Sequence, residues 1–135
     1  MQVVSLGHPD DGGNETTSAL KWLRLGGEGI DTAYVYGNQR EVGEAFRQSG
    51  VARDSVFITT KIPCPPTNSS DPVTPAMAVA AVELDLRELG LEYADLLLLH
   101  WPCKAGQADT RAAWLGLQHA LERKLVRAAD EGASQ

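Results

Sequence analysis

The sequence contains no run of apolar residues long enough to cross a membrane. None of its apolar stretches approaches the roughly 18 residues that a transmembrane helix needs. The N-terminus also lacks the basic segment and the apolar stretch of a secretory signal peptide. We therefore expect a cytoplasmic protein without a membrane partner, and its 135 residues suit a single domain.

Cysteine and positive charge are both scarce. The two cysteines, Cys64 and Cys103, are too few for a disulfide framework, and we interpret them as unpaired, inert thiols near a pocket. Twelve Lys and Arg against 18 Asp and Glu give a net charge of −6. Because proteins that bind phosphate backbones present basic patches, this balance argues against a nucleic-acid partner. The hydrophobic fraction of 43% is sufficient for a buried core.

A Gly-x-Gly-x-x-Gly motif is also missing, which disfavours a doubly wound dinucleotide-binding fold. What the chain does show is an alternation of short apolar segments with longer amphipathic ones. We predict strands at residues 3–6, 29–33, 56–62 and 95–100, and helices at residues 15–25, 39–48, 75–89 and 110–124. Such alternation implies right-handed crossovers and a parallel sheet. An open doubly wound sheet and part of a (β/α)8 barrel both fit, although a complete barrel needs about 250 residues.

Local signals mark several boundaries of these segments. Asn38, followed three residues later by Glu41, predicts a helix N-cap with a capping box. Thr74 before Pro75 predicts another helix start, and residues 63–75 hold five of the seven prolines, which is typical of a loop. Residues 96–99 are apolar at every position, which predicts a strand covered on both faces.

Reactive side chains follow three consecutive predicted strands. Asp31 and Tyr36 follow the second strand, Lys61 closes the third and His100 closes the fourth. Because the C-terminal ends of parallel strands share one edge, these groups can meet in one pocket. Each of these residues alone also has a purely structural interpretation. The aspartate can form a turn, the tyrosine and the histidine can pack against neighbours, and the lysine can face solvent. Their coincidence at equivalent strand ends favours a catalytic site, with no metal expected.

Three segments resemble signature motifs of the aldo-keto reductase family. Residues 29–38 read Gly-Ile-Asp-Thr-Ala-Tyr-Val-Tyr-Gly-Asn and are followed by Glu41, Val42 and Gly43. Residues 57–61 resemble the third-strand motif, and residues 84–86 and 89–102 resemble the segment that ends in the catalytic histidine. The resemblance covers about residues 26–127. It implies an α/β fold, a partial (β/α)8 TIM barrel with about the first four strand–helix units and parallel strands.

The resemblance also implies an activity, the NADPH-dependent reduction of a small aldehyde or ketone to an alcohol by hydride transfer. Tyr36 would be the general acid, and a nearby Lys61 ammonium would make its proton easier to lose. Asp31 would pair with Lys61 and belong to the cofactor-binding residues. His100 would orient the carbonyl by hydrogen bonding, with Trp101 beside it as a substrate-binding or simply packing residue.

Two segments depart from the family pattern. Residues 6–11 read Leu-Gly-His-Pro-Asp-Asp where the family has Leu-Gly-Thr, and nothing supports His8 as a catalytic base. Residues 129–135 read Ala-Asp-Glu-Gly-Ala-Ser-Gln where the family continues into an Ile-Gly-Val-Ser-Asn-Phe-like strand. We therefore interpret residues 1–135 as a single truncated domain with a non-family tail at 129–135, arising from a fragment, a truncated splice product or an altered reading frame.

The truncation leaves other functional interpretations open. The main alternative is a catalytically inactive remnant or an interaction module. In either case the exposed sheet edges favour self-association. A Schiff-base lyase that uses Lys61 is a further alternative. The Asp31–Tyr36 spacing disfavours the lyase, because that spacing matches the reductase motif.

Overall fold

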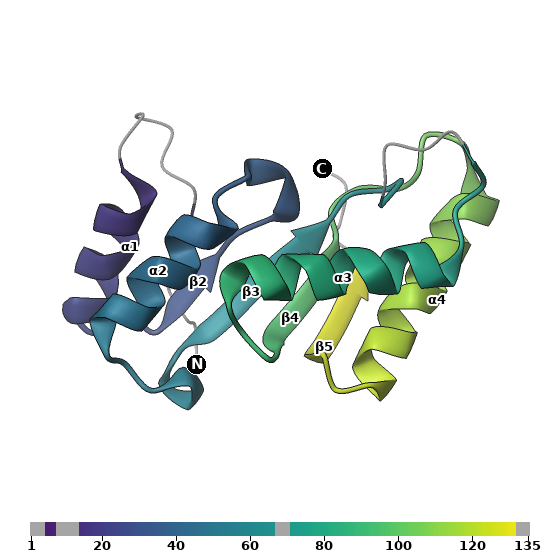
Figure 1. Ribbon diagram of the computed structural model, residues 1–135. Coiled ribbons are helices and arrows are strands. Elements are labelled where there is room, and N and C mark those ends of the chain that lie inside the picture. Colours follow the sequence, from purple (N-terminus) through teal and green to yellow (C-terminus); the bar gives the residue numbers. More distant parts are fainter. Residues whose placement is uncertain (1–4, 8–13, 67–70, 132–135) are drawn as a thin grey trace.

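The computed structural model describes residues 5–7, 14–66 and 71–131, which form one parallel sheet with helices packed on it (Figure 1). The strands, in both chain and spatial order, are β1 (Ser5–Leu6), β2 (Gly29–Asp31), β3 (Phe57–Ile62), β4 (Ala94–Leu99) and β5 (Val126–Glu131). Every neighbouring pair is parallel. The connecting helices are α1 (Glu15–Arg24), α2 (Gln39–Ser49), α3 (Pro75–Leu89) and α4 (Gln107–Glu122), with short 3₁₀ turns η1 (Tyr34–Tyr36) and η2 (Arg53–Ser55).

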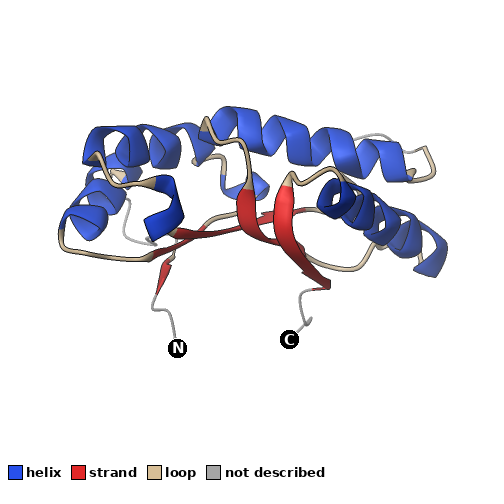
Figure 2. Ribbon diagram, turned by 90° about the horizontal axis from the view of Figure 1, so that it is seen from below, coloured by secondary structure: helices blue, strands red, loops and turns tan. Residues whose placement is uncertain are grey.

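The order of the strands decides between the two architectures that the sequence left open. Each strand pairs with the next one in the chain, without the reversal of order that defines a doubly wound sheet. The helices accordingly lie on one face of the sheet (Figure 2). Successive right-handed crossovers that always step in one direction produce this arrangement. The prediction of a partial barrel with parallel strands is therefore confirmed.

Two apolar clusters join the helices to the sheet. The larger one packs α3 and α4 against β3, β4 and β5, and Leu97, Leu99 and Leu117 are fully buried in it. The smaller one joins α1 and α2 to β2 and β3 through residues such as Ile30 and Ile58. Burying a side chain of this size stabilises the fold by roughly 1.5–3 kcal/mol. No helix in the described part of the chain is both long and apolar enough to span a membrane.

Two helical glycines allow the helices to approach each other closely. A Cβ at Gly43 of α2 would overlap the backbone carbonyl of Leu89 at the end of α3. A Cβ at Gly116 of α4 would lie 2.5 Å from both the Ala78 Cβ and the Pro75 carbonyl oxygen. Glycine costs helix stability relative to alanine, and here the cost is offset because α3 can contact both of its neighbours along their backbones.

The predicted elements agree with the structure apart from their ends. Thr74 caps α3 as expected, since its side-chain oxygen accepts a hydrogen bond from the Met77 N–H. Helix α4 begins at Gln107, three residues before the predicted start, because the turn at Gly106 already provides the entry to the helix. Of the predicted first strand, Ser5 and Leu6 form β1, whereas residues 3 and 4 lie outside the described residues, as does His8.

The fifth strand was not predicted. Residues 126–131 pair with β4, with Leu96 opposite Ala128 and Leu97 opposite Ala129, although this segment contains few of the residues that favour strands. Residues 129–131 of the expected tail therefore continue the sheet. The backbone N–H and C=O groups along β4 need partners, and the returning chain supplies them whatever its side chains are.

The apolar run of β4 is covered on one face rather than on both as predicted. Leu97 and Leu99 are buried against α3 and α4, whereas Leu96 and Leu98 are only half-buried. In Figure 2 the described helices leave the second face of the sheet uncovered. In a closed barrel this face of the sheet lies inside, where other side chains pack against it. The run of leucines in β4 suits packing on both faces.

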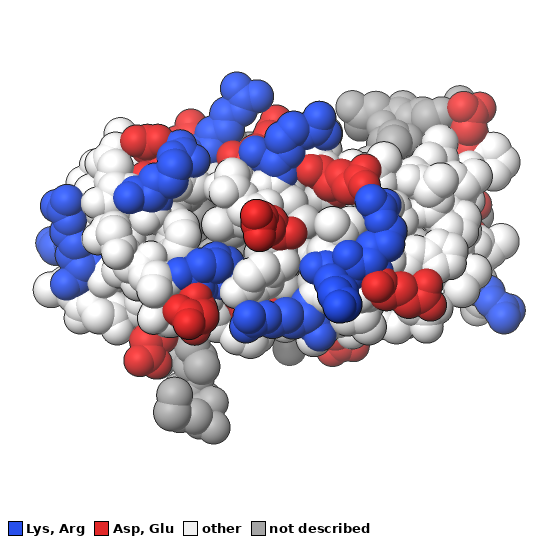
Figure 3. All heavy atoms as spheres, turned by 60° about the horizontal axis from the view of Figure 1, so that its bottom comes forward, with Lys and Arg blue, Asp and Glu red and all other residues white. Residues whose placement is uncertain are grey.

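Charged side chains are intermixed on the face seen in Figure 3, where the bottom of Figure 1 comes forward. Acidic and basic groups are mixed there. Ion pairs among the described residues include Arg123 with Glu83 and Arg40 with Glu88. On this face a phosphate backbone would meet no continuous basic surface.

Candidate active site

The four predicted reactive residues come from three neighbouring strand ends. Asp31 is the last residue of β2, Lys61 is the last but one of β3, and His100 directly follows β4. Tyr36 ends the 3₁₀ turn η1 that follows β2. The register of β2, β3 and β4 places these ends side by side, and the structure brings all four residues into one cluster.

Lys61 is the centre of this cluster. Its ammonium group forms an ion pair with the Asp31 carboxylate and donates a hydrogen bond of 3.1 Å to the Thr32 carbonyl oxygen. The same Nζ lies 3.5 Å from the Tyr36 hydroxyl oxygen. The Lys61 side chain is 13% exposed and that of Asp31 is 39% exposed. A largely buried cation therefore lies beside the hydroxyl of Tyr36.

His100 lies on the other side of Tyr36. The two rings meet edge to face, with 5.8 Å between their centroids. Burial lowers the pKa of His100 below its usual value, and the Lys61 ammonium lowers it further, while the Asp31 carboxylate opposes both. At neutral pH the imidazole is thus uncharged, so one ring nitrogen carries a proton to donate. Its Nδ1 atom is buried with no hydrogen-bond partner in the described part of the chain.

The loop that carries Tyr36 is held at both ends by a buried hydrogen bond. The Thr32 hydroxyl donates to the Asn38 side-chain oxygen over 2.7 Å, and both residues are buried. Asn38 occupies the N-cap position of α2 as predicted, but its side chain makes no capping hydrogen bond there, because its oxygen accepts from Thr32. The residues between them, including Tyr36, therefore form a closed turn above β2.

Trp101 joins this cluster to the neighbouring loop. Its indole stacks on the His100 imidazole with ring centroids 4.4 Å apart, and its Nε1 donates a hydrogen bond of 2.9 Å to the Cys64 carbonyl oxygen. The indole also lines a groove of about 940 Å³, together with Tyr34, Val35, Lys104 and three prolines. Trp101 thus packs on His100 while 37% of the residue remains accessible.

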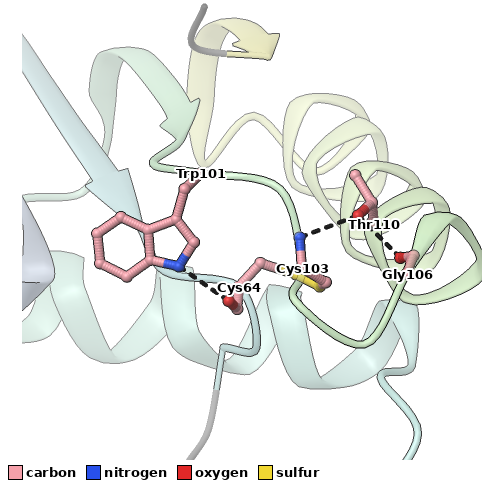
Figure 4. Close-up of a disulfide and its surroundings, with 5 residues drawn as sticks. All are labelled: Cys64, Trp101, Cys103, Gly106 and Thr110. Carbon is pink, nitrogen blue, oxygen red and sulfur yellow. Dashed lines mark hydrogen bonds between the residues drawn. A yellow bond between two sulfur atoms is a disulfide. The ribbon is translucent and has the colours of Figure 1, made fainter. Parts of the chain in front are cut away.

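The two cysteines are joined in a disulfide, so the prediction of free thiols is wrong (Figure 4). Cys64 and Cys103 have Cα atoms 4.7 Å apart, a separation that suits a disulfide. A signal for this pairing was present in the sequence. Each cysteine stands three residues after a predicted site residue, Lys61 or His100, and those residues end neighbouring parallel strands.

A buried acidic residue lies behind β3. The Thr60 hydroxyl, next to Lys61 in the chain, donates a hydrogen bond of 2.6 Å to the Asp85 carboxylate of α3. Burial raises the pKa of Asp85 from 3.8 to about 6, and the hydrogen bond from Thr60 opposes this rise. Asp85 is fully inaccessible, and a hydrogen bond with the Gln39 side chain also opposes the rise of its pKa.

We expect Asp85→Asn to flatten the pH dependence of stability near pH 5. Between pH 4 and 6 the folded state binds more protons at Asp85 than the unfolded state does. Its contribution is therefore complete below about pH 4 and is lost as the pH rises through about 6, with a total change of about 3 kcal/mol. Asparagine cannot titrate and keeps an oxygen to accept from Thr60.

Chemical denaturation of both proteins across this pH range measures the effect. The free energy of unfolding of the variant, relative to that of the parent, should increase steadily from pH 4 to pH 7. A difference that stays constant over the range would show that Asp85 does not titrate there.

The comparisons with known proteins can now be set beside this geometry. A model of the Aldo/keto reductase family matches residues 14–128. The 9,11-endoperoxide prostaglandin H2 reductase of Trypanosoma cruzi is 44% identical over 117 residues, which are 86% of this chain and 38% of that protein. Glyoxal reductase of Bacillus subtilis is 36% identical over 119 residues, which are 87% of this chain and 40% of that protein.

Solved structures show the same relation. An aldo-keto reductase from a Medee basin deep-sea metagenome library superposes with a TM-score of 0.79 at 30% identity, over 97% of this chain and 46% of that one. The Bombyx mori aldo-keto reductase in complex with NADP gives a TM-score of 0.77 at 28% identity, with the same coverage. The chain thus spans less than half the length of these relatives.

Proposed function

Because this chain belongs to the aldo/keto reductase family, we propose that it reduces a small aldehyde or ketone to an alcohol with NADPH as the hydride donor. The observation that carries this proposal is the contact of one buried ammonium with both a carboxylate and a phenol. Lys61 pairs with Asp31 and lies 3.5 Å from the Tyr36 hydroxyl. This arrangement prepares a phenol to release its proton.

The proposed chemistry adds a hydride and a proton across the carbonyl bond. Bound NADPH would supply the hydride to the carbonyl carbon. Tyr36 gives the proton at Oη to the carbonyl oxygen, and Lys61 stabilises the phenolate that remains. The neutral His100 imidazole donates a hydrogen bond that orients the same oxygen. Asp31 keeps the ammonium in place through their ion pair.

The residues of this chain fit the reacting end of such a cofactor. The side chain of Asp31 is 39% exposed at the strand ends although it pairs with Lys61, so a ligand can reach it beside Tyr36. NADP(+) is the cofactor named for one relative, the glycerol 2-dehydrogenase (NADP(+)) of Saccharomyces cerevisiae, which is 40% identical over 91 residues, 67% of this chain and 27% of that protein. We propose Asp31 as the residue of this chain that helps to hold the nicotinamide.

A second candidate is an inactive remnant that serves as an interaction module. The observation that favours it is the uncovered face of the sheet, on which Leu96 and Leu98 are only half-buried. The catalytic cluster would then persist without turnover. Binding of NADPH separates the two candidates, because the reductase needs it and the module does not.

The test is consumption of NADPH by the purified chain with a small reactive aldehyde. We expect alcohol to form in the same amount as NADPH is consumed, and Lys61→Met, prepared in parallel, to lose this activity because its side chain cannot be charged. Absence of turnover and of NADPH binding by a folded chain would reject the reductase and favour the interaction module. Turnover that Lys61→Met retains would reject the proposed roles of the cluster.

A further inference from the structure

We propose that Cys64 and Cys103 form a redox-controlled clamp on the active-site loops, which a dithiol reductant opens and oxidation closes. The disulfide connects the loop after β3 with the loop after β4, three residues beyond Lys61 and His100 respectively (Figure 4). It therefore joins the two strand ends that carry these side chains. The inference that opening affects catalysis rests on the proposed function, whereas the clamp itself does not.

The clamp reaches the reacting residues through Trp101. The indole donates a hydrogen bond to the Cys64 carbonyl oxygen and stacks on the His100 imidazole. A shift of Cys64 therefore removes the acceptor that holds the indole, and the indole is one of the surfaces that hold the imidazole. Figure 4 shows the indole N–H directed at Cys64, on the same side as the disulfide.

The two halves of the clamp are anchored differently. The Cys103 N–H donates to the Thr110 hydroxyl over 2.9 Å, and that hydroxyl donates to the Gly106 carbonyl oxygen over 3.1 Å. These bonds tie Cys103 to the first turn of α4 whether or not the disulfide is present. The Cys64 side is joined to the same loop by the disulfide and by the bond from Trp101. Reduction should therefore displace Cys64 more than Cys103.

The reaction is a thiol–disulfide exchange. A thiolate of the external dithiol attacks Sγ of Cys103, the more accessible cysteine at 7% against 1% for Cys64, and Cys64 leaves as a thiolate that takes up a proton. The second thiol of the reductant then attacks the mixed disulfide and releases Cys103. Two electrons pass to the protein, and the dithiol becomes a cyclic disulfide.

The first measurement counts thiols and records thermal stability with dithiothreitol as the probe. The chain purified in air should show no free thiol when denatured, and two after reduction. Because the disulfide closes a loop across 39 residues of sequence separation, reduction should lower Tm by about 10 °C or more. In Cys103→Ser, which has no disulfide, dithiothreitol should leave Tm unchanged. Two free thiols in the air-purified chain would overturn the proposal.

The second measurement follows Trp101. Its emission, taken as the difference between the parent chain and Trp101→Phe, should change on reduction well below Tm and return when the dithiol is removed in air. Cys103→Ser should already show the reduced spectrum. A Trp101 signal that is identical in both redox states would overturn the coupling, even if Tm responds.

The third measurement applies if the chain turns over aldehyde. Loss of folded protein alone would lower the apparent kcat and leave KM unchanged. Because the clamp positions the side chains that orient the carbonyl, we expect reduction to raise KM for the aldehyde severalfold in the parent and not in Cys103→Ser. An unchanged KM would overturn the link to catalysis. If there is no turnover at all, the proposed function fails, and the thiol count and the Trp101 signal still decide the clamp.

Discussion

Tyr36→Phe should lower kcat/KM for a small aldehyde by about 100-fold or more. The substitution removes one oxygen, the atom that lies 3.5 Å from the Lys61 Nζ, and leaves the ring that contacts His100. Without that hydroxyl the alkoxide formed by hydride transfer has no proton donor at the predicted position. The expected loss lies in the chemical step, so kcat falls more than KM rises.

Tyr34→Phe is the matched control for this measurement. Tyr34 belongs to the same 3₁₀ turn and lines the groove beside it, but it is not part of the Lys61 cluster. We expect its kcat to remain near that of the parent chain. The thermal stability of both variants should match the parent. An equal loss of activity in the two variants would show that the turn matters and that the Tyr36 hydroxyl has no special role.

Asp95→Ala should destabilise the fold by about 3–5 kcal/mol, a large share of the 5–15 kcal/mol that a domain has in total. The Asp95 side chain is 5% exposed and accepts hydrogen bonds from the Arg53 Nη2 at 2.6 Å and from the Ile58 backbone N–H at 2.9 Å. Arg127 adds a contact of 3.1 Å from a more exposed position. Alanine would leave the Ile58 N–H without its acceptor and the Arg53 guanidinium without its carboxylate partner.

The neighbours of Asp95 explain why the loss would be large. The Arg53 guanidinium also donates to the Val56 and Tyr93 carbonyl oxygens and lies 4.0 Å from the centre of the Tyr93 ring. Arg127 lies 4.3 Å from the centre of the same ring. Asp95 thus ties η2, β3 and the start of β5 to β4, at the strand ends opposite the Lys61 cluster. A single buried carboxylate pairs with two guanidinium groups that lie near the same ring.

Urea denaturation with two comparison variants tests this prediction. Glu83→Ala removes the partner of Arg123 from a pair that is about half exposed, and it should cost about 1 kcal/mol or less. Asp95→Asn keeps an acceptor but loses the charge, so its cost should fall between the other two. Equal costs for Asp95→Ala and Glu83→Ala would show that the buried network contributes no more than a surface ion pair.

Much of the fold was predictable because local signals and tertiary structure agree. Helix α3 begins at Pro75 and ends before Gly90 as its cap residues indicate, and the spacing of apolar residues identified its buried face. Strand β3 was found from its β-branched residues. Strand β5 was missed because its sequence carries no comparable signal, and it exists through pairing with β4. Propensity cannot report a strand that is imposed by its neighbour.

The candidate site was likewise predictable only in part. The positions of Asp31, Tyr36, Lys61 and His100 at equivalent strand ends follow from the sequence, because the alternation of elements predicts parallel strands whose ends meet. The hydrogen bond from Thr32 to Asn38 could not be anticipated, since an asparagine before a helix is most often its cap. Whether the Asn38 side chain bonds to Thr32 or to the first turn of α2 depends on the path by which the loop reaches the helix.

The sequence by itself thus determined which residues stand at the strand ends, since spacing and periodicity are local properties of the chain. The tertiary structure decided which of these residues are in contact and which are bonded to each other. It placed the ammonium of Lys61 between Asp31 and Tyr36, and it joined Cys64 to Cys103. Those outcomes depend on the register and spacing of two neighbouring strands, which their backbone hydrogen bonds set once the strands are paired.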